Sequence, residues 1–328
     1  MKLVYYNNAV PNFGDDLNAA IWPSLAPALF AEATGEGFVG IGTIIGMASE
    51  LDRLTVFSSG VGYDRTNRWA NKTVRYACVR GPVSAEVLGL DQDSAITDGA
   101  VLVPLVGGFP AKATGGGGVI IIPHWETIAY PGWDEVARLT GFQVIDPRGN
   151  PLSVAQAIAR ASLVLTESLH GAVLADLYGL PWTAFATSRN FSVTKWVDWS
   201  MSLGRGFSLT LIPPPDPGPV LAHGRRPEAY GRRLTFSMDD ALREMQARIG
   251  EPAPAPVGAA ARLRARAKTL VGDSSLLRPL LGFNAQRTAR ALIALAQAPE
   301  TPTSASIIET LQQRMMSRLD ALSKEAAA

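Results

Sequence analysis

Residues 163–185 read LVLTESLHGAVLADLYGLPWTAF, a pattern that predicts a strand, a helix and a second strand in succession. Residues 163–165 form a short apolar run typical of a buried strand, and residues 182–185 read as the next strand. Gly179 suits the position just after a helix end, and Pro181 cannot continue a helix. The helix between the two strands should therefore end before Gly179.

The loop between the first of these strands and the helix carries Glu167, Ser168 and His170. We expect the helix to begin near Ser168 or His170, where its free N–H groups can attract an anion. In a parallel sheet such a loop lies at the carboxyl edge, where ligands bind. The alternative is that His170 merely caps the helix and Glu167 faces water. Histidine occurs only three times in the chain, and the position of His170 at a ligand edge favours a site.

The composition is that of a soluble globular protein. With 328 residues, of which 47% are hydrophobic, the chain is long enough for two domains with cores of their own. The 30 basic and 29 acidic side chains give a net charge of +1, which argues against nucleic acid or an acidic polymer as partner. Any anion-binding site must therefore be local.

Cysteine usage and apolar runs indicate the compartment. Cys78 is the only cysteine, which excludes an internal disulfide and fits a reducing compartment. The first residues lack the apolar run of a signal peptide, and no run reaches the roughly 20 apolar residues of a membrane helix. A cytoplasmic protein is therefore expected. Because no metal-ligand spacing or P-loop stands out, neither a metal nor a cofactor is expected.

Strands alternate with helices along most of the chain. The expected strands lie at residues 3–6, 38–45, 54–62, 74–79, 119–122, 143–145, 163–165 and 182–185. Residues 95–106 are expected to form a loop and a strand, and Ser153 with Gln156 reads as a capping box for the following helix. This alternation predicts an α/β fold with two doubly wound, Rossmann-like domains that face each other across a cleft.

Glycine and proline runs mark the expected domain boundaries. The four glycines at 115–118 are the best candidate for a hinge. They separate an N-terminal domain at 1–114 from a C-terminal domain at 119–250. A proline- and alanine-rich linker opens the remaining segment at 251–328, which is expected to be a helical tail.

Two further features have alternative interpretations. Residues 259–290 hold seven basic side chains and one acidic, a local charge of +6, which suits either an anionic membrane surface, a partner, or a tail with solvated arginines. Trp182, Trp196 and Trp199 suit either stacking on a sugar face or the core.

Arg80 and His124 each lie directly after another of the expected strands. Arg80 precedes a helix that should begin near Pro82 and end at Gly89. A guanidinium beside free helix N–H groups makes a pocket for phosphate or carboxylate, and an arginine paired with a neighbouring acid is an equally good interpretation. His124 follows the strand at 119–122 and is either a second site residue or an ordinary turn residue.

A set of short motifs, taken in order, resembles the polysaccharide pyruvyl transferases. The motifs are NFGDD at 12–16, the glycine-bearing strand ends around 40–62, RGPVS at 80–84, TDG at 97–99, PH at 123–124 and SLHG at 168–171. The likeness is closest to the exopolysaccharide ketal-pyruvate transferases of the succinoglycan type, and it covers roughly residues 1–205.

The resemblance implies a two-domain fold like that of the GT-B glycosyltransferases, with the acceptor on the N-terminal side and the donor on the C-terminal side. It also implies phosphoenolpyruvate as donor and a lipid-linked oligosaccharide or polysaccharide as acceptor. By that likeness His170 corresponds to the histidine of the family's Arg-Leu-His motif, and Ser168 stands where the family has arginine. Arg80, Arg189 or Lys195 would then have to supply the missing charge.

Pyruvate ketal formation needs a proton for the enol methylene, attack by two sugar hydroxyls and loss of phosphate. A histidine with a near-neutral pKa can donate that proton, so His170 is the expected acid. Asp15 either orients or deprotonates the acceptor hydroxyl or is only a helix cap. The expected substrate-binding residues are Asn12, Gly14, Arg80, His124, Ser168, Gly171, Arg189 and Lys195.

Two other functions stay open at this point. One is a glycosyltransferase that uses a nucleotide sugar, for which the donor ribose would want a carboxylate and Asp176 faces no obvious site. The other is a non-catalytic binding protein in a polysaccharide-assembly complex, with the basic tail as its docking element. Independently of this choice, the basic tail makes peripheral contact with the cytoplasmic face of the membrane an expected location.

Overall fold

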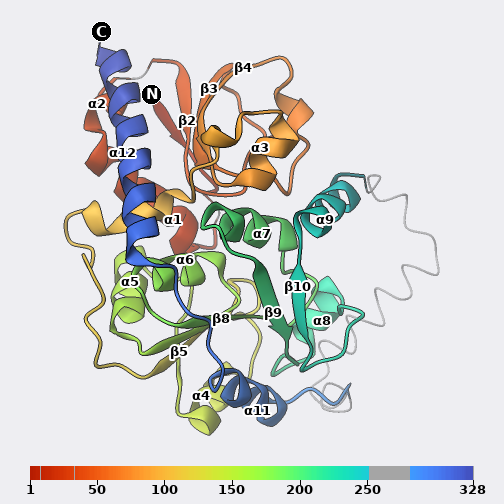
Figure 1. The fold of residues 1–328 in the computed structure, drawn as a ribbon. Coiled ribbons are helices and arrows are strands. Elements are labelled where there is room, and N and C mark those ends of the chain that lie inside the picture. The colour runs from red at the N-terminus through yellow and green to blue at the C-terminus, as the bar shows by residue number, and fades with distance from the viewer. Residues whose placement is uncertain (8, 33, 251–280, 328) are drawn as a thin grey trace.

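The computed structural model describes residues 1–7, 9–32, 34–250 and 281–327, and their strands form two sheets (Figure 1). The expected linker that begins at residue 251 and the basic residues at 259–280 lie outside the described residues. No helix within the described ranges has the length and the apolar character that crossing a membrane requires.

The first sheet has the order β1-β2-β3-β4, and all of its strands are parallel. Its strands are β1 (Lys2–Val4), β2 (Glu36–Val39), β3 (Arg53–Ser59) and β4 (Thr73–Val79). The second sheet has the order β10-β9-β8-β7-β5-β6, with only the β9–β10 pair antiparallel. Its strands are β5 (Val119–Ile122), β6 (Gln143–Val144), β7 (Leu163–Thr166), β8 (Trp182–Ala186), β9 (Phe207–Leu211) and β10 (Arg233–Phe236).

Helices follow most of the parallel strands and pack beside the sheets, which confirms the predicted α/β class. They are α1 (Phe13–Leu25), α2 (Pro27–Phe30), α3 (Pro82–Leu88), α4 (Trp133–Thr140), α5 (Pro151–Arg160), α6 (Leu169–Leu177), α7 (Val193–Ser202), α8 (Gly218–His223), α9 (Met238–Gly250), α11 (Ala285–Leu295) and α12 (Ala305–Ala327). The described residues also form the short 3-10 helices η1 (Thr66–Trp69), η2 (Gln92–Ser94) and η3 (Gly99–Leu105). The predicted bounds of β5, residues 119–122, match the observed ones.

Two local predictions are wrong. Residues 99–105 form η3 rather than a strand, because the Asp98 carboxylate accepts the N–H of Ala100 at 3.0 Å and starts a tight turn. Helix α5 begins at Pro151 and is capped by Asn150, whose side-chain oxygen accepts the N–H groups of Leu152 and Ser153. The predicted capping box at Ser153 therefore lies inside the helix.

Aromatic side chains fill the core beneath the second sheet. Trp182, Trp196 and Trp199 are each at most 1% exposed, and their rings lie within 6.3 Å of one another. These three rings belong to the core and are not available for stacking on a sugar.

The C-terminal helices pack back on both halves of the molecule (Figure 1). Helix α11 packs on α4, while α12 runs alongside α2, η3 and β4. Gln312 and Arg318 of α12 donate to the carbonyls of Val101 and Ala77. The chain therefore returns from the second sheet to the first before it ends.

The glycine run at 115–118 joins the two sheets. The N–H groups of Thr114 and Gly115 donate to the carbonyl of Ala159, and that of Gly117 donates to Arg160 at the end of α5. Gly115 and Gly116 adopt positive φ angles of 64° and 82°, which favour glycine. The hinge at this point stays a prediction, as do the domain boundaries at 114, 119 and 250.

Candidate active site

A cavity of about 320 Å³ lies where loops from the two sheets meet. Its lining residues follow strands of both sheets at their carboxyl ends, the edge at which parallel α/β sheets bind ligands. From the first half they include Tyr6, Asn12, Asp15, Thr43, Tyr63 and Arg80. From the second half they include His124, Glu126, Ser168, His170, Asn190 and Lys195.

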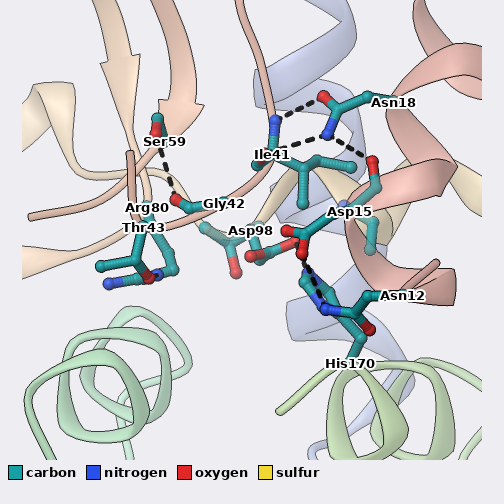
Figure 2. A network of polar contacts seen from close by, with 12 residues as sticks. Asn12, Asp15, Asn18, Ile41, Gly42, Thr43, Ser59, Arg80, Asp98 and His170 are labelled. Atoms are coloured by element: carbon teal, nitrogen blue, oxygen red, sulfur yellow. Dashed lines mark hydrogen bonds and ion pairs between the residues drawn. The ribbon is translucent and has the colours of Figure 1, made fainter. Parts of the chain in front are cut away.

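Asp15 lies in the first turn of α1, which begins directly after an asparagine. Asn12 donates from Nδ2 to Asp15 Oδ2 at 2.7 Å, and Asn18 holds the same turn by donating to the Asp15 carbonyl (Figure 2). Burial raises the pKa of Asp15 above its ordinary value of 3.8, although His170, Asn12 and Lys195 act in the opposite direction. Asp15 is thus a carboxyl group suited to exchanging protons.

Asn18 also fixes the loop that follows β2. Its Oδ1 accepts the N–H of Ile41 at 2.7 Å and the indole N–H of Trp22 at 2.7 Å, while its Nδ2 donates to the Ile41 carbonyl. The side chain is fully buried, so these bonds replace all contact with water. They place Gly42 and Thr43 beside α1 at the cavity wall.

His170 lies in the first turn of α6 with its ring packed against the backbone of α1. A Cβ atom built on Gly14 would come within 1.8 Å of His170 Nδ1, so only glycine leaves room for the imidazole. On the other side Nε2 is buried and lies 3.7 Å from Asp98 Oδ1, an ion-pair distance that is too long for a hydrogen bond. His170 lines the cavity, and Nδ1 is the ring nitrogen that does not face Asp98.

Asp98 is the buried partner of this histidine (Figure 2). Burial acts to raise the pKa of Asp98, but the charge of His170 and the N–H of Ala100 lower it overall below 3.8. An ionised carboxylate at this position attracts a positively charged imidazole ring. The pair resembles the general arrangement of a proton-transferring histidine with a carboxylate that orients it.

Arg80 is 1% exposed and forms a buried ion pair between the two halves. Its Nε donates to Asp198 Oδ2 at 3.0 Å, and its Nη1 donates to Thr43 Oγ1 at 2.7 Å. Asp198 also accepts from the backbone and the hydroxyl of Ser84 in the first turn of α3. The Asp198 carboxylate thus lies against the Arg80 guanidinium, where a ligand anion was one of the two expectations. This contact corresponds to the other expectation, an arginine paired with an acidic residue of the protein.

Glu167 is 2% exposed, so the interpretation that it faces water is wrong. One carboxylate oxygen accepts from the backbone and hydroxyl of Thr187 at 2.7 Å, and the other accepts from Thr127 Oγ1 and the His124 N–H. Since these residues follow β5 and β8, and Glu167 itself follows β7, its carboxylate connects the carboxyl ends of three neighbouring strands. These hydrogen bonds hold the loops of the second sheet in fixed positions.

The structure brings most of the predicted site residues together. Seven of them line the cavity: Asn12, Asp15, Arg80, His124, Ser168, His170 and Lys195. Gly14 and Gly171 lie behind it, against the His170 ring and Thr166. Arg189 is exposed and does not line the cavity.

Sequence reasoning missed several residues of the site. Asp98, Asn190 and Asp198 make side-chain contacts to the predicted residues from elsewhere in the chain. Asp98 lies in the TDG motif at 97–99, which was the one available signal. Within the described ranges no group of three or more histidine, cysteine or acidic side chains is arranged to hold a metal ion.

Comparison with known proteins identifies the family of the chain. The family model described as polysaccharide pyruvyl transferase matches residues 38–189, which span the strands from β2 to β8. The succinoglycan biosynthesis protein ExoV of Rhizobium meliloti (strain 1021) is 34% identical over 222 residues, which cover 65% of this chain and 68% of that protein. The fold, the gathered motif residues and this identity together show that the chain belongs to the polysaccharide pyruvyl transferase family.

Proposed function

We propose that the protein transfers the enolpyruvyl group of phosphoenolpyruvate onto a sugar of an exopolysaccharide repeat unit as a pyruvate ketal, with release of phosphate. The observation that carries the proposal is the combination of Lys195 and the His170–Asp98 pair in one cavity of a family member. Lys195 has no hydrogen-bond or ion-pair partner among the residues that the structure describes, so its ammonium group is available to an anionic donor.

The reaction needs one acid and two acceptor hydroxyls. A proton adds to C3 of the enol, which leaves a cation-like centre at C2, and the first sugar hydroxyl attacks it. Breaking the C2–O bond to phosphate regenerates that centre, and the second hydroxyl closes the ketal. Of the two hydroxyl protons, one restores the acid and the other leaves with the phosphate.

The residues of the cavity suit these steps. His170 would give the proton to C3 through Nδ1, while the Asp98 carboxylate behind the ring stabilises the positive imidazole. Asp15, with its raised pKa, would accept a proton from the attacking hydroxyl. Lys195 would hold the donor's negative charge, which is the role that Ser168 cannot fill in place of arginine.

In this mechanism Arg80 does not bind the donor but positions the elements around it. Its contacts with Asp198 and Thr43 connect α7, which carries Lys195, with the loop after β2. A two-domain arrangement like that of the GT-B enzymes is proposed on the same grounds, since both sheets direct their carboxyl edges at one cavity. The first sheet would then serve the acceptor and the second the donor.

The contacts of one carboxylate disfavour a nucleotide-sugar donor. Asp176, the carboxylate considered for a ribose, is 1% exposed and accepts from Trp182 Nε1, Arg205 Nη1 and the Thr303 N–H. It therefore has its partners within the protein and does not reach the cavity.

Thermal-shift measurements with phosphoenolpyruvate, UDP and GDP test the proposal, because a ligand that binds only the folded state raises its melting temperature. We expect a shift with phosphoenolpyruvate alone. Lys195→Ala should abolish that shift, whereas Arg189→Ala, which removes an exposed charge outside the cavity, should leave it unchanged. A shift with UDP or GDP and none with phosphoenolpyruvate would reject the proposed donor.

A further inference from the structure

We infer that His124 is held as a neutral imidazole with its proton on Nε2, and that it donates this N–H to an anionic oxygen of the donor substrate instead of exchanging protons. The second half of this inference rests on the proposed function, whereas the first half depends only on contacts around the ring. The two cavity histidines would then have separate roles: His170 transfers a proton, and His124 binds a negatively charged oxygen of the donor.

Two donors fix the state of His124 Nδ1. Asn190 Nδ2 lies 3.0 Å from Nδ1 and also donates to Glu126 Oε2, so its two hydrogens are both used. Turning the Asn190 amide around would press its oxygen against the Glu126 carboxylate, which places two acceptors in contact. The backbone N–H of Glu126 also points at Nδ1, at 3.3 Å. Nδ1 must therefore offer a lone pair, and the ring proton lies on Nε2.

The surroundings of His124 disfavour a second proton on the ring. Protonated Nδ1 would face the two N–H donors just described. Glu126 Oε2, 3.7 Å from Nδ1, would favour a positive ring, but the Asn190 amide already binds it. Burial lowers the pKa of His124 well below 6.5, and the charges of Lys195 and His223 act in the same direction. The ring thus stays neutral wherever the protein is folded near neutral pH.

The free side of the ring faces the cavity. His124 is a lining residue, and its Nε2 has no hydrogen-bond partner among the described residues. Lys195 lines the same cavity and is close enough for its charge to act on His124. A neutral N–H beside an ammonium group suits a carboxylate or phosphate oxygen, because both groups donate and neither accepts. Glu126 and Asn190 are positioning residues that set the tautomer.

Nitrogen NMR of the full chain labelled in its histidine rings tests the tautomer directly. The chain has only three histidines, so His124→Gln, His170→Gln and His223→Gln assign every signal. We expect His124 Nδ1 to keep the chemical shift of an unprotonated nitrogen, and Nε2 that of a protonated one, from pH 5.5 to pH 9. A His124 signal that titrates in this range, or a protonated Nδ1, would overturn the inference.

Asn190→Asp tests the cause, since it replaces the donor to Nδ1 with an acceptor. We expect the proton to move to Nδ1 and the ring to titrate, while Asn67→Asp, the same change at an exposed position, alters neither. If Asn190→Asp leaves the tautomer as it was, the amide does not set it. For the ligand, His124→Leu should raise the dissociation constant of phosphoenolpyruvate about 10- to 100-fold, the usual effect of losing a hydrogen bond to a charged group.

Results for the ring and for the ligand can be told apart. The predicted tautomer together with no phosphoenolpyruvate binding by the parent protein would reject the donor assignment and the proposed function while the tautomer stands. Phosphoenolpyruvate binding that His124→Leu does not weaken would reject the donor assignment alone.

Discussion

Gly14→Ala places one methyl group where the catalytic histidine of the proposed mechanism lies. The new Cβ would be 1.8 Å from His170 Nδ1, and carbon-sized atoms need about 3.5 Å. The ring must therefore move by about 1.7 Å or the backbone of α1 must yield. A displacement of about 1 Å at a reacting group costs roughly 100-fold in rate, so we expect kcat to fall by at least about that factor.

The same substitution should change stability much less than activity. Alanine is favoured over glycine in a helix by about 1 kcal/mol, and overpacking costs about 1 to 3 kcal/mol, so the free energy of unfolding should change by less than about 2 kcal/mol. Phosphate release from phosphoenolpyruvate with an acceptor present measures kcat, and urea denaturation measures stability. Gly107→Ala is the matched control, because its Cβ would meet nothing within 4 Å.

A double-mutant comparison shows whether the loss acts through the ring. Gly14→Ala combined with His170→Ala should be no slower than His170→Ala alone, since the displaced group is then absent. A Gly14→Ala protein with parental kcat would refute the assignment of His170. So would a double mutant whose losses simply multiply.

Three further predictions concern the Arg80–Asp198 ion pair, the contacts of Asp176 with the segment before α12, and the pH dependence of stability. Arg80→Ala leaves the fully buried Asp198 without its counter-charge and should cost about 3 to 5 kcal/mol of unfolding free energy by urea denaturation; a loss below about 1 kcal/mol with a raised KM for phosphoenolpyruvate would assign the guanidinium to the ligand. Asp176→Ala removes the acceptor of Trp182, Arg205 and Thr303 and should lower the melting temperature, whereas an unchanged value would mean that these contacts do not hold the connection between α11 and α12. The folded-state pKa of Asp15 is raised, so the stability that this group contributes is present below pH 3.8 and is lost as pH rises through the raised value. Asp15→Asn should therefore stabilise the protein at pH 7 but not at pH 3. Equal changes in unfolding free energy at both pH values would contradict a raised pKa.

Local patterns predicted much of the fold. Apolar runs located β5 and β7, and Gly89 and Gly179 were correctly placed after helix ends, where both have positive φ angles. Parallel strands place their loops at one edge, so this rule alone indicated that His124 and His170 belong to a ligand edge. These features depend on residues that are neighbours in the chain.

Contacts between distant residues could not be predicted in this way. The Arg80–Asp198 pair joins residues 118 positions apart, and nothing near Arg80 indicates its partner. Gly14 was assigned to the substrate by its motif, yet its Cβ position lies against the ring of His170. Residues 95–106 were expected to form a loop and a strand, and the strand failed because one buried carboxylate, Asp98, outweighed the β-propensity of the valines that follow. Such features require the tertiary structure.

Pyruvyl transfer itself is tested most directly by incubating the protein in heavy water with phosphoenolpyruvate and a panel of oligosaccharide repeat units. Mass spectrometry of the acceptor and a phosphate assay then follow the same reaction. The proposal predicts one phosphate released for each acceptor that gains pyruvate less water, with one deuterium in the new methyl group. His170→Ala should abolish both signals. Phosphate release without a modified acceptor, or a full set of acceptors that neither gain mass nor cause phosphate release, would contradict it.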